Sequence, residues 1–342
     1  MPRPTVRDVA DEAGVSLATV DRVLNARPGV RAQTVSRVQK AISKLGYVRD
    51  TYAANLARQR DYKFAFLLPK GPSQFVETLK DALAEAIVAQ AADRISVQVY
   101  SIPLNDPHAV VRELRALQSQ PFDGVGIMST ETPEVRDAVR RLKAAGVPVV
   151  AVVSDLPSAQ RDYFVGIKSI SAGRTAGLLI GRFARVSEGQ VLVVTPSTLS
   201  HDSLERRLGF DAVIANEFTG LQVLPTIETH ADPDRTRAVI ARAARTYSNI
   251  VGIYSMGSGN APLLDALREN NLLSGRPVIA HELTPLTREA LLNGELDAVI
   301  TQNIGHLVRS ALRVLRAKSD HAAIYEDQER IRIDIVTREN LP

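Results

Sequence analysis

Hydrophobic positions recur at helical spacing in three short segments of the first fifty residues. The first segment, residues 6–13, places apolar side chains three and four residues apart, and Gly14 follows it. The second segment, residues 17–24, and the third, residues 34–45, repeat this spacing, and Gly46 closes the third. The pattern predicts three helices, with a glycine-containing turn between the first two.

Polar residues mark the expected starts of these helices. Thr5 precedes Asp8 by three residues, which is the spacing of a capping box, and Ser16 is a suitable N-cap for the second helix. Thr34 is expected to begin the third helix. A helix, a short turn and a second helix form a helix-turn-helix, whose second helix lies in the major groove of DNA.

Strands and helices alternate from Lys63 onward. Continuous apolar strands are expected at residues 64–68, 95–101, 124–128, 147–153, 190–194, 222–227, 250–254, 277–280 and 298–301. Amphipathic helices are expected at residues 75–92, 108–119, 134–145, 203–217, 232–246, 261–270 and 285–293. Apolar strands between such helices predict parallel sheets covered on both faces, and two such series predict two doubly wound lobes. Ligands of these sheets bind at the carboxyl ends of the strands.

The charge distribution separates the helical region from the body. Residues 1–60 hold 11 Lys and Arg against 5 Asp and Glu, a net of +6, and the remainder holds 31 against 33, a net of −2. A basic unit beside a near-neutral body favours a polyanion as its partner, although a solvated basic face has the same composition. The chain of 342 residues has no cysteine, which fits a reducing cytoplasm. No apolar segment follows Met1, so we expect neither export nor membrane insertion.

The predicted second helix carries side chains suited to a duplex. Arg22 can pair with guanine or with a phosphate, whereas Leu17 and Ala18 can make only apolar contacts. Groups that can anchor phosphates stand at Ser16, Thr19, Asn25 and Thr34. A small helical bundle that only caps itself is the alternative interpretation.

The stretch from Thr5 to Asn25 resembles the headpiece of the lactose-repressor (LacI/GalR) family of transcriptional regulators, and the similarity continues through Leu45-Gly46-Tyr47. The resemblance implies that positions 17, 18 and 22 read bases and that short polar residues, Thr5 among them, grip phosphates. Asp21 departs from the family pattern, which usually has serine there. Tyr47-Val48-Arg49-Asp50 also departs, because the family usually has Tyr-x-Pro-Asn.

Residues 51–60 contain helix formers without a sufficient apolar face, and so short a helix is marginal by itself in water. The segment resembles the family's hinge helix, which orders on operator DNA, and Leu56 matches the residue that wedges into the minor groove. A plain linker is the alternative. The hinge would let a distant ligand control DNA binding, because hinge order and DNA contact are coupled.

The body resembles the type I periplasmic sugar-binding fold of the same family. The implied fold class is an all-α helix-turn-helix headpiece followed by two doubly wound α/β lobes with parallel sheets. The implied domains are a headpiece at 1–50, a hinge at 51–60 and an effector-binding and dimerisation domain at 61–342. Within that domain the N-lobe comprises about 62–166 and 303–326, and the C-lobe about 167–302 and 327–342.

Strand ends and this resemblance together nominate a set of effector-binding residues. These are Gln74, Phe75, Ser129, Asp155, Arg206, Asn260, Glu282 and Gln302. Arg206 and Gln302 match the family's ligand-gripping arginine and cleft glutamine. Carboxylates and amides pair with adjacent hydroxyls, and arginine forks onto neighbouring oxygens, so the set suits a sugar or polyol. A strand-end cap or an interlobe salt bridge is the alternative role for each residue, and His201 and Arg161 are further loop candidates.

Departures from the family pattern prevent the transfer of a known effector. Gly166-Ile167-Lys168-Ser169 replaces a common Asp-Asn pair, and Met256-Gly257-Ser258-Gly259-Asn260 replaces the usual Asn-Asp, where Asn260 can supply the missing polar group. Glu282 stands where an aspartate is usual.

The sequence predicts a cytoplasmic, homodimeric repressor of sugar or polyol catabolism genes, with operator DNA and a small sugar-like effector as partners. No cofactor, metal ion or membrane is expected. An enzyme is the first rival class, but the chain has no P-loop, nucleophile elbow or His-Glu-x-x-His pair. A transport-type binding protein is the second rival class. Within regulators, a purine or phosphosugar effector and an activator or corepressor mode stay open.

Overall fold

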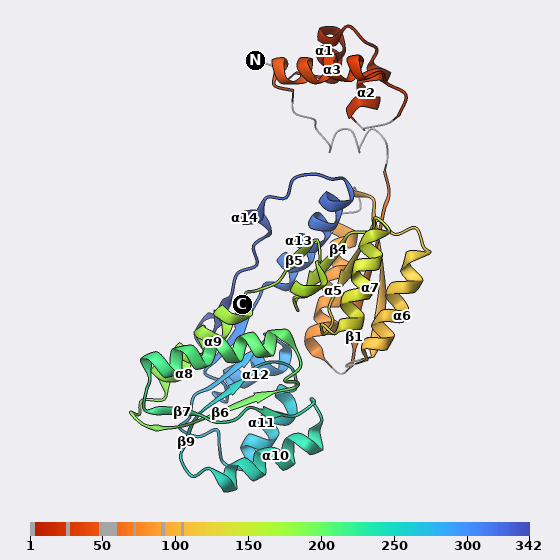
Figure 1. The fold of residues 1–342 in the computed structure, drawn as a ribbon. Helices are drawn as coiled ribbons and strands as arrows, with labels where there is room; N and C mark the ends of the chain where they lie inside the picture. The colour runs from red at the N-terminus through yellow and green to blue at the C-terminus, as the bar shows by residue number, and fades with distance from the viewer. Residues whose placement is uncertain (1–3, 25–27, 48–59, 72, 90–92, 104–105) are drawn as a thin grey trace. The chain divides into compact units, whose positions relative to one another are not determined.

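The computed structural model describes residues 4–24, 28–47, 60–71, 73–89, 93–103 and 106–342. The chain divides into two compact units, residues 1–60 and residues 61–342 (Figure 1). Each unit has hydrophobic clusters of its own.

The first unit contains three helices, α1 (Val6–Ala13), α2 (Leu17–Leu24) and α3 (Ala32–Leu45). The predicted capping box is confirmed, because Thr5 Oγ1 accepts from the Asp8 backbone N–H and the Asp8 carboxylate accepts from the Thr5 backbone N–H. The predicted start of the third helix at Thr34 is wrong, since α3 begins two residues earlier with Arg31 as its N-cap. The first residues of α3 are exposed, so the hydrophobic spacing revealed only the helix from Val35 onward.

The headpiece helices enclose a small core. Its buried members come from α1, α2 and α3 and are Val9, Ala10, Ala13, Val20, Val38 and Ala41. These are the positions at three- and four-residue spacing, so the amphipathic faces of three short helices stabilise one another. Left-handed glycines end α1 at Gly14 and α3 at Gly46.

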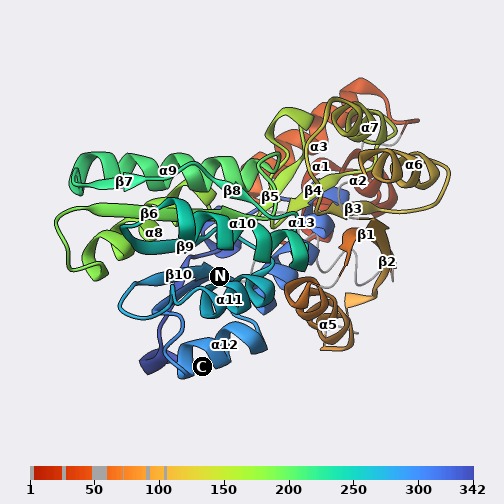
Figure 2. The same ribbon diagram turned by 90° about the horizontal axis from the view of Figure 1, so that it is seen from below.

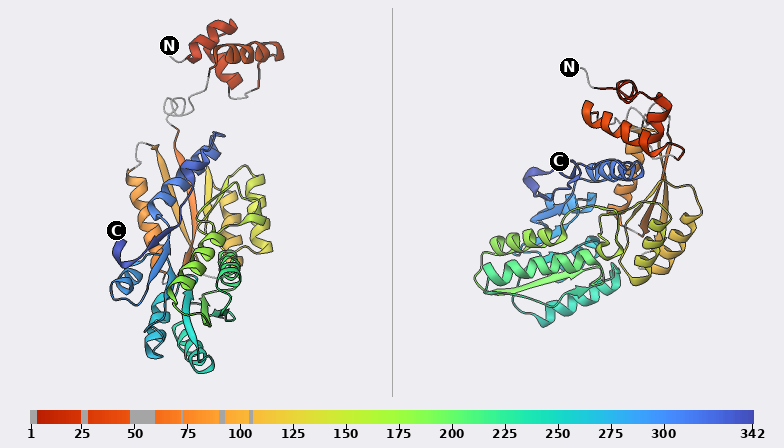
Figure 3. Two further views of the ribbon diagram at one scale, coloured as in Figure 1. Left: turned by 90° about the vertical axis from the view of Figure 1, so that its left-hand side faces the viewer. Right: turned by 45° about the horizontal axis from the view of Figure 1, so that its top comes forward.

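The second unit begins with a five-stranded parallel sheet in the order β2-β1-β3-β4-β5. Its strands are β1 (Tyr62–Lys70), β2 (Ile95–Pro103), β3 (Gly124–Ile127), β4 (Val149–Val152) and β5 (Tyr163–Val165). One face packs against α5 (Gln74–Ala89) and α13 (Ile304–Ser319), and the other against α6 (Pro107–Gln118) and α7 (Pro133–Ala144). Figure 3 shows α13, in blue, running alongside the strands of this sheet.

The second sheet has the order β12-β11-β10-β9-β6-β7, with β8 also paired to β6. Its strands are β6 (Gly189–Thr195), β7 (Leu221–Val223), β8 (Ile227–Glu228), β9 (Ile250–Ser255), β10 (Val278–His281), β11 (Ala298–Thr301) and β12 (Asp334–Val336). Among these described strands, β12 alone is antiparallel to its neighbour. The covering helices are α8 (Ser169–Phe183) and α9 (His201–Glu217) on one face, and α10 (Pro233–Thr246), α11 (Asn260–Glu269) and α12 (Pro285–Leu292) on the other (Figure 2).

Three connections join the two sheets. The chain passes from β5 to α8, from β11 to α13, and through α14 (Glu326–Glu329) to β12. The expected α/β architecture with parallel sheets covered on both faces is confirmed. The predicted strand at 222–227 is wrong, because this segment forms two short strands, β7 and β8.

Candidate functional sites

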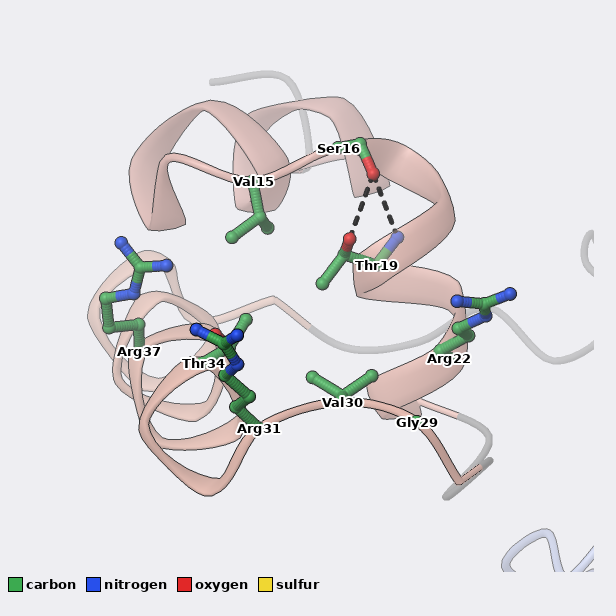
Figure 4. A pocket seen from close by; sticks show the side chains of 9 residues that line it. All are labelled: Val15, Ser16, Thr19, Arg22, Gly29, Val30, Arg31, Thr34 and Arg37. Carbon is green, nitrogen blue, oxygen red and sulfur yellow. Dashed lines mark hydrogen bonds between the residues drawn. The ribbon is translucent and has the colours of Figure 1, made fainter.

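The headpiece has a pocket of about 330 Å³ between α2 and the start of α3. It brings together four residues that the sequence nominated for DNA contact, namely Ser16, Thr19, Arg22 and Thr34. The remaining lining residues are Val15, Gly29, Val30, Arg31 and Arg37 (Figure 4). Residues just before and within α2, in the segment before α3 and in the first turns of α3 thus line one concave surface.

The outward face of α2 has the composition expected of a base-reading helix. Leu17 is 45% exposed, and Ala18 and Arg22 are also exposed, whereas Val20 is fully buried against the other helices. The Ser16 hydroxyl accepts from the Thr19 backbone N–H at 3.2 Å and lies 2.9 Å from the Thr19 hydroxyl. This local cap fixes the first turn of α2, from which Leu17 and Ala18 project.

The remaining DNA-contact predictions fall in different places. The Thr5 hydroxyl donates to the Asp8 carboxylate at 2.8 Å, so it already serves the cap of α1. The hydrogen bonds from the Thr5 backbone N–H and from the Thr5 hydroxyl hold the pKa of Asp8 below its usual value. Asn25 and Leu56, with the rest of the hinge up to residue 59, lie outside the described residues. Arg31 and Arg37 were not nominated, because only the packing of α3 against α2 places them beside Ser16 and Thr19.

The second unit holds a cluster of buried polar side chains around Arg206 of α9. Arg206 is only 3% exposed, and its Nη1 donates to the Met256 carbonyl at 2.5 Å, just beyond the end of β9. Its Nη1 also lies 4.0 Å from the Asp202 carboxylate. The backbone carbonyl of Met256 therefore helps to hold the arginine in place.

Glu282 and Gln302 follow directly after β10 and β11, at the carboxyl edge of the second sheet. Gln302 Nε2 donates to Glu282 Oε1 at 3.3 Å, and both side chains are buried. Among the described residues, no hydrogen-bond partner reaches Arg206 Nε, Glu282 Oε2 or Gln302 Oε1. Burial raises the pKa of Glu282 to about 7, although the Arg206 charge opposes this rise.

Beneath this cluster lies a pair that the sequence did not reveal. The Tyr254 hydroxyl is 2.8 Å from His281 Nε2, and the Tyr254 ring stacks on Phe210 with centroids 4.8 Å apart. His281 is fully buried, which, together with the nearby Arg206 charge, holds its pKa well below the usual value. Burial likewise raises the pKa of Tyr254. Both residues stand within strands that are otherwise mainly apolar, so pattern alone gave them no polar role.

Asn260 has both ends of its amide engaged inside the C-lobe. Its Oδ1 accepts from the Ser255 hydroxyl at 2.7 Å, and its Nδ2 donates to the His281 carbonyl at 3.1 Å. The residue therefore links the ends of β9 and β10. This contact matches the alternative role of a strand-end cap that the sequence left open for it.

The other four nominated effector residues belong to the N-lobe. Gln74 is exposed at the start of α5 beside the buried Phe75, and Ser129 is half-buried after β3. Asp155, after β4, accepts from Arg161 through both carboxylate oxygens, with Arg161 Nη2 at 2.7 Å from Oδ2. The Asp155 carboxylate also accepts from the Leu156 backbone N–H. Arg161, a loop candidate in the sequence, is thus the ionic partner of Asp155.

The described residues contain no group of three or more His, Asp or Glu side chains placed to hold a metal ion. None of the helices described combines the length and the apolar character needed to cross a bilayer.

The chain combines a helix-turn-helix headpiece with a body of two α/β lobes, each built on a mainly parallel sheet. This is the architecture of a regulator with a periplasmic-binding-protein-like body. The family description "Bacterial regulatory proteins, lacI family" matches residues 5–50, and "Periplasmic binding protein domain" matches residues 64–322. The chain belongs to the lacI family of bacterial regulatory proteins, with a periplasmic binding protein domain as its body, and the family prediction is confirmed.

Curated relatives carry names of regulators. The chain is 29% identical over 175 residues to the HTH-type transcriptional regulator GntR of Pseudomonas aeruginosa, covering 51% of this chain and 49% of GntR. It is 29% identical to RegA of Clostridium saccharobutylicum, covering 64% of this chain and 70% of RegA. It is 32% identical to catabolite control protein A of Priestia megaterium, covering 46% of this chain and 48% of that protein. The matches thus span about half the length of GntR and of catabolite control protein A.

Solved structures with the same fold are covered over nearly their whole length. GanP, a glucose-galactose binding protein from Geobacillus stearothermophilus, superposes with a TM-score of 0.74 at 14% identity, covering 83% of this chain and 99% of GanP. An ABC transporter solute-binding protein from Burkholderia graminis, in complex with D-arabinose, superposes with a TM-score of 0.73 at 22% identity. The match covers 82% of this chain and 96% of that protein. At these identities the likeness shows the fold of the body.

Proposed function

We propose that this protein is a homodimeric, sequence-specific DNA-binding regulator whose body binds a small sugar or polyol. The headpiece at 1–50 would bind operator DNA, the hinge at 51–60 would order on it, and residues 61–342 would sense the effector and dimerise. The basic net charge of residues 1–60 supports this division, as does the exposed face of α2. Because its partner is DNA, the protein would act in the cytoplasm, as a binding protein rather than an enzyme.

The observation that carries the effector proposal is the set of buried atoms without partners on Arg206, Glu282 and Gln302. A buried polar group that lacks a hydrogen bond costs about 1–3 kcal/mol, so a ligand that supplies the missing bonds would gain that energy. Two of the three atoms are side-chain oxygens and the third is an N–H donor. A hydroxylated ligand serves both kinds, because each hydroxyl donates one hydrogen bond and accepts others.

The names of relatives agree with this ligand chemistry. Solved structures of the same fold were determined with D-arabinose, D-allose and α-D-tagatopyranose. We extend this chemistry to the present chain and propose that the N-lobe residues Gln74, Phe75, Ser129 and Asp155 complete the site. Repression relieved by the effector is the proposed mode, with effector-favoured DNA binding as its alternative.

Thermal denaturation of the full chain tests the effector proposal. The panel contains D-arabinose, D-allose, D-tagatose and polyols, with purines and phosphosugars as the rival classes. A true ligand at one hundred times its dissociation constant stabilises by about 2.7 kcal/mol. Arg206→Ala should lose this shift, whereas the exposed-surface variant Arg242→Ala should keep it. A normal shift in Arg206→Ala would overturn the site assignment.

Binding to genomic fragments tests the DNA half independently. A salt-sensitive preference for some fragments over others is expected, and Arg206→Ala should retain it because that residue lies in the second unit. Failure to bind any duplex at low salt would overturn the proposed function.

A further inference from the structure

The outer side of α9 is apolar, and the part of the chain that the structure describes leaves it uncovered. Leu204 and Leu208 stand four residues apart, so they lie on the same side of the helix, and they are 55% and 62% exposed. The inner side is apolar as well, because Phe210 and Ile214 are buried against the second sheet. A helix with apolar side chains on opposite sides is expected to be covered on both.

Exposed hydrophobic side chains concentrate in this part of the chain. Thirteen large hydrophobic side chains are exposed in the described residues, and seven of them lie between residues 170 and 208. They come from α8, from α9 and from the residues between these two helices, which pack together over one face of the second sheet (Figure 2). Single exposed leucines are ordinary on a protein surface, whereas such a concentration is typical of an interface. The seven are Ile170, Leu178, Phe183, Val186, Leu199, Leu204 and Leu208.

Smaller side chains continue the row of leucines along α9. Ala212 and Ala215 follow at helical spacing, the first half-buried and the second exposed, and we call Leu204, Leu208, Ala212 and Ala215 the α9 patch. An antiparallel second copy of the helix would set Leu204 against Ala215. It would also set Leu208 against Ala212, since both pairs are centred near position 210. A parallel copy would set leucines on leucines and alanines on alanines, which fills the space between the helices unevenly.

Charges beside the patch fit the same antiparallel arrangement. Arg207 Nε donates to both carboxylate oxygens of Asp211 at 2.8 Å, one turn along α9, and Arg207 Nη1 donates to the Leu224 carbonyl at 3.1 Å. The midpoint of Arg207 and Asp211 is position 209, beside the centre of the patch. An antiparallel copy therefore brings each arginine opposite the aspartate of the other copy, so that opposite charges meet across the contact.

We propose that the α9 patch binds the α9 patch of a second copy of this chain, with the two helices antiparallel about a twofold axis. The same residues then serve both sides of the contact, as a twofold interface requires. The inference goes beyond the proposed function, because this surface lies apart from the buried cluster around Arg206 and needs neither effector nor DNA. Association through the patch doubles the number of copies that the remaining surface of the protein holds together.

Engineered cysteines test the register of the two helices, since the chain has no cysteine of its own. Leu204→Cys and Ala215→Cys are prepared separately as full chains, mixed, allowed to exchange and oxidised. The mixture should form a disulfide-linked dimer with one chain of each variant, because the two positions face each other, whereas either variant alone should form several-fold less. In the matched control, Tyr325→Cys, at an exposed position outside the patch, replaces Leu204→Cys. Equal yields from the two mixtures would overturn the inference.

Light scattering on the full chain tests the patch itself. Leu208→Glu would place a charge inside the contact, so the molar mass of the assembly should fall to about half that of the parent protein. Leu204→Glu should have the same effect, whereas Tyr325→Glu should keep the parent mass, and far-UV circular dichroism confirms that each variant is folded. Folded leucine variants that keep the parent mass overturn the inference. A parent protein that binds duplex DNA as a single chain overturns it too, while the DNA-binding function stands.

Discussion

Gly173 of α8 and Arg206 of α9 approach so closely that a Cβ added to Gly173 would lie 1.9 Å from the Arg206 carbonyl oxygen. A second glycine makes the reciprocal contact, since a Cβ on Gly209 would lie 2.0 Å from the Ile170 carbonyl oxygen. The two helix backbones therefore touch where Arg206 is held. The packing of α8 against α9 thus sets the position of Arg206, which carries one of the buried atoms without a partner.

Gly173→Ala should destabilise the protein by about 3 kcal/mol, because the added methyl meets backbone that cannot move without separating the helices. Urea denaturation measures the free energy of unfolding. Gly71→Ala is the control, since nothing lies within 4 Å of a Cβ at that position. Equal stability of the two variants would contradict the close approach.

Tyr254→Phe should lower the free energy of unfolding by about 1–3 kcal/mol, because it leaves the buried His281 Nε2 without its partner. The same measurement on Tyr325→Phe serves as the control, since Tyr325 is 73% exposed and the loss of its hydroxyl should change stability by less than about 0.5 kcal/mol. A loss no larger than that of the control would argue against the hydrogen bond to His281.

Local signals in the sequence predicted local structure well. The capping box of Thr5 and Asp8 depends on four consecutive residues, and the structure contains it. Glu282 and Gln302 were nominated from their places after two strands together with the resemblance to the family, and the structure joins them by a hydrogen bond. Their role toward an effector stays a prediction.

The missed features depend on contacts between distant segments. Helix α8 was not predicted, because Gly173, Gly177 and Gly181 weaken a helical pattern. These glycines allow α8 to pack closely against α9 and against Phe218, which follows α9. A Cβ added at any of the three would meet α9 or Phe218. The pairing of Tyr254 with His281 likewise needs the register of two neighbouring strands.

Glu282→Gln should change how stability depends on pH. The pKa of Glu282 is raised from 4.5 to about 7 in the folded state, so the folded protein binds this proton more tightly than the unfolded chain. The resulting stabilisation is fully present below the unfolded pKa and is lost as pH rises through about 7. A shift of one pKa unit corresponds to about 1.4 kcal/mol. As pH rises through this range, the free energy of unfolding of the parent protein should therefore fall by up to about 3 kcal/mol relative to that of Glu282→Gln.

Denaturation of both proteins at pH 5 and pH 8 measures this difference. The titration of His281 is common to both proteins and cancels in the comparison. Glu85→Gln, which changes an exposed carboxylate on α5, controls for the substitution itself. A difference between the parent and Glu282→Gln that stays constant across this range would show that Glu282 is ionised throughout.

Arg22→Ala should weaken the preference for one sequence over another while leaving most of the non-specific affinity. Arg22 is exposed at the end of α2, and a bidentate contact from arginine to guanine contributes about 1–3 kcal/mol of discrimination. Selection from a random duplex library with the parent protein gives the preferred sequence, and competition against an unrelated duplex then gives the specificity ratio of each variant. Lys40→Ala, which removes an exposed lysine of α3, is the control. Since a phosphate contact weakens all duplexes alike, a uniform loss in Arg22→Ala would reassign this arginine to the backbone.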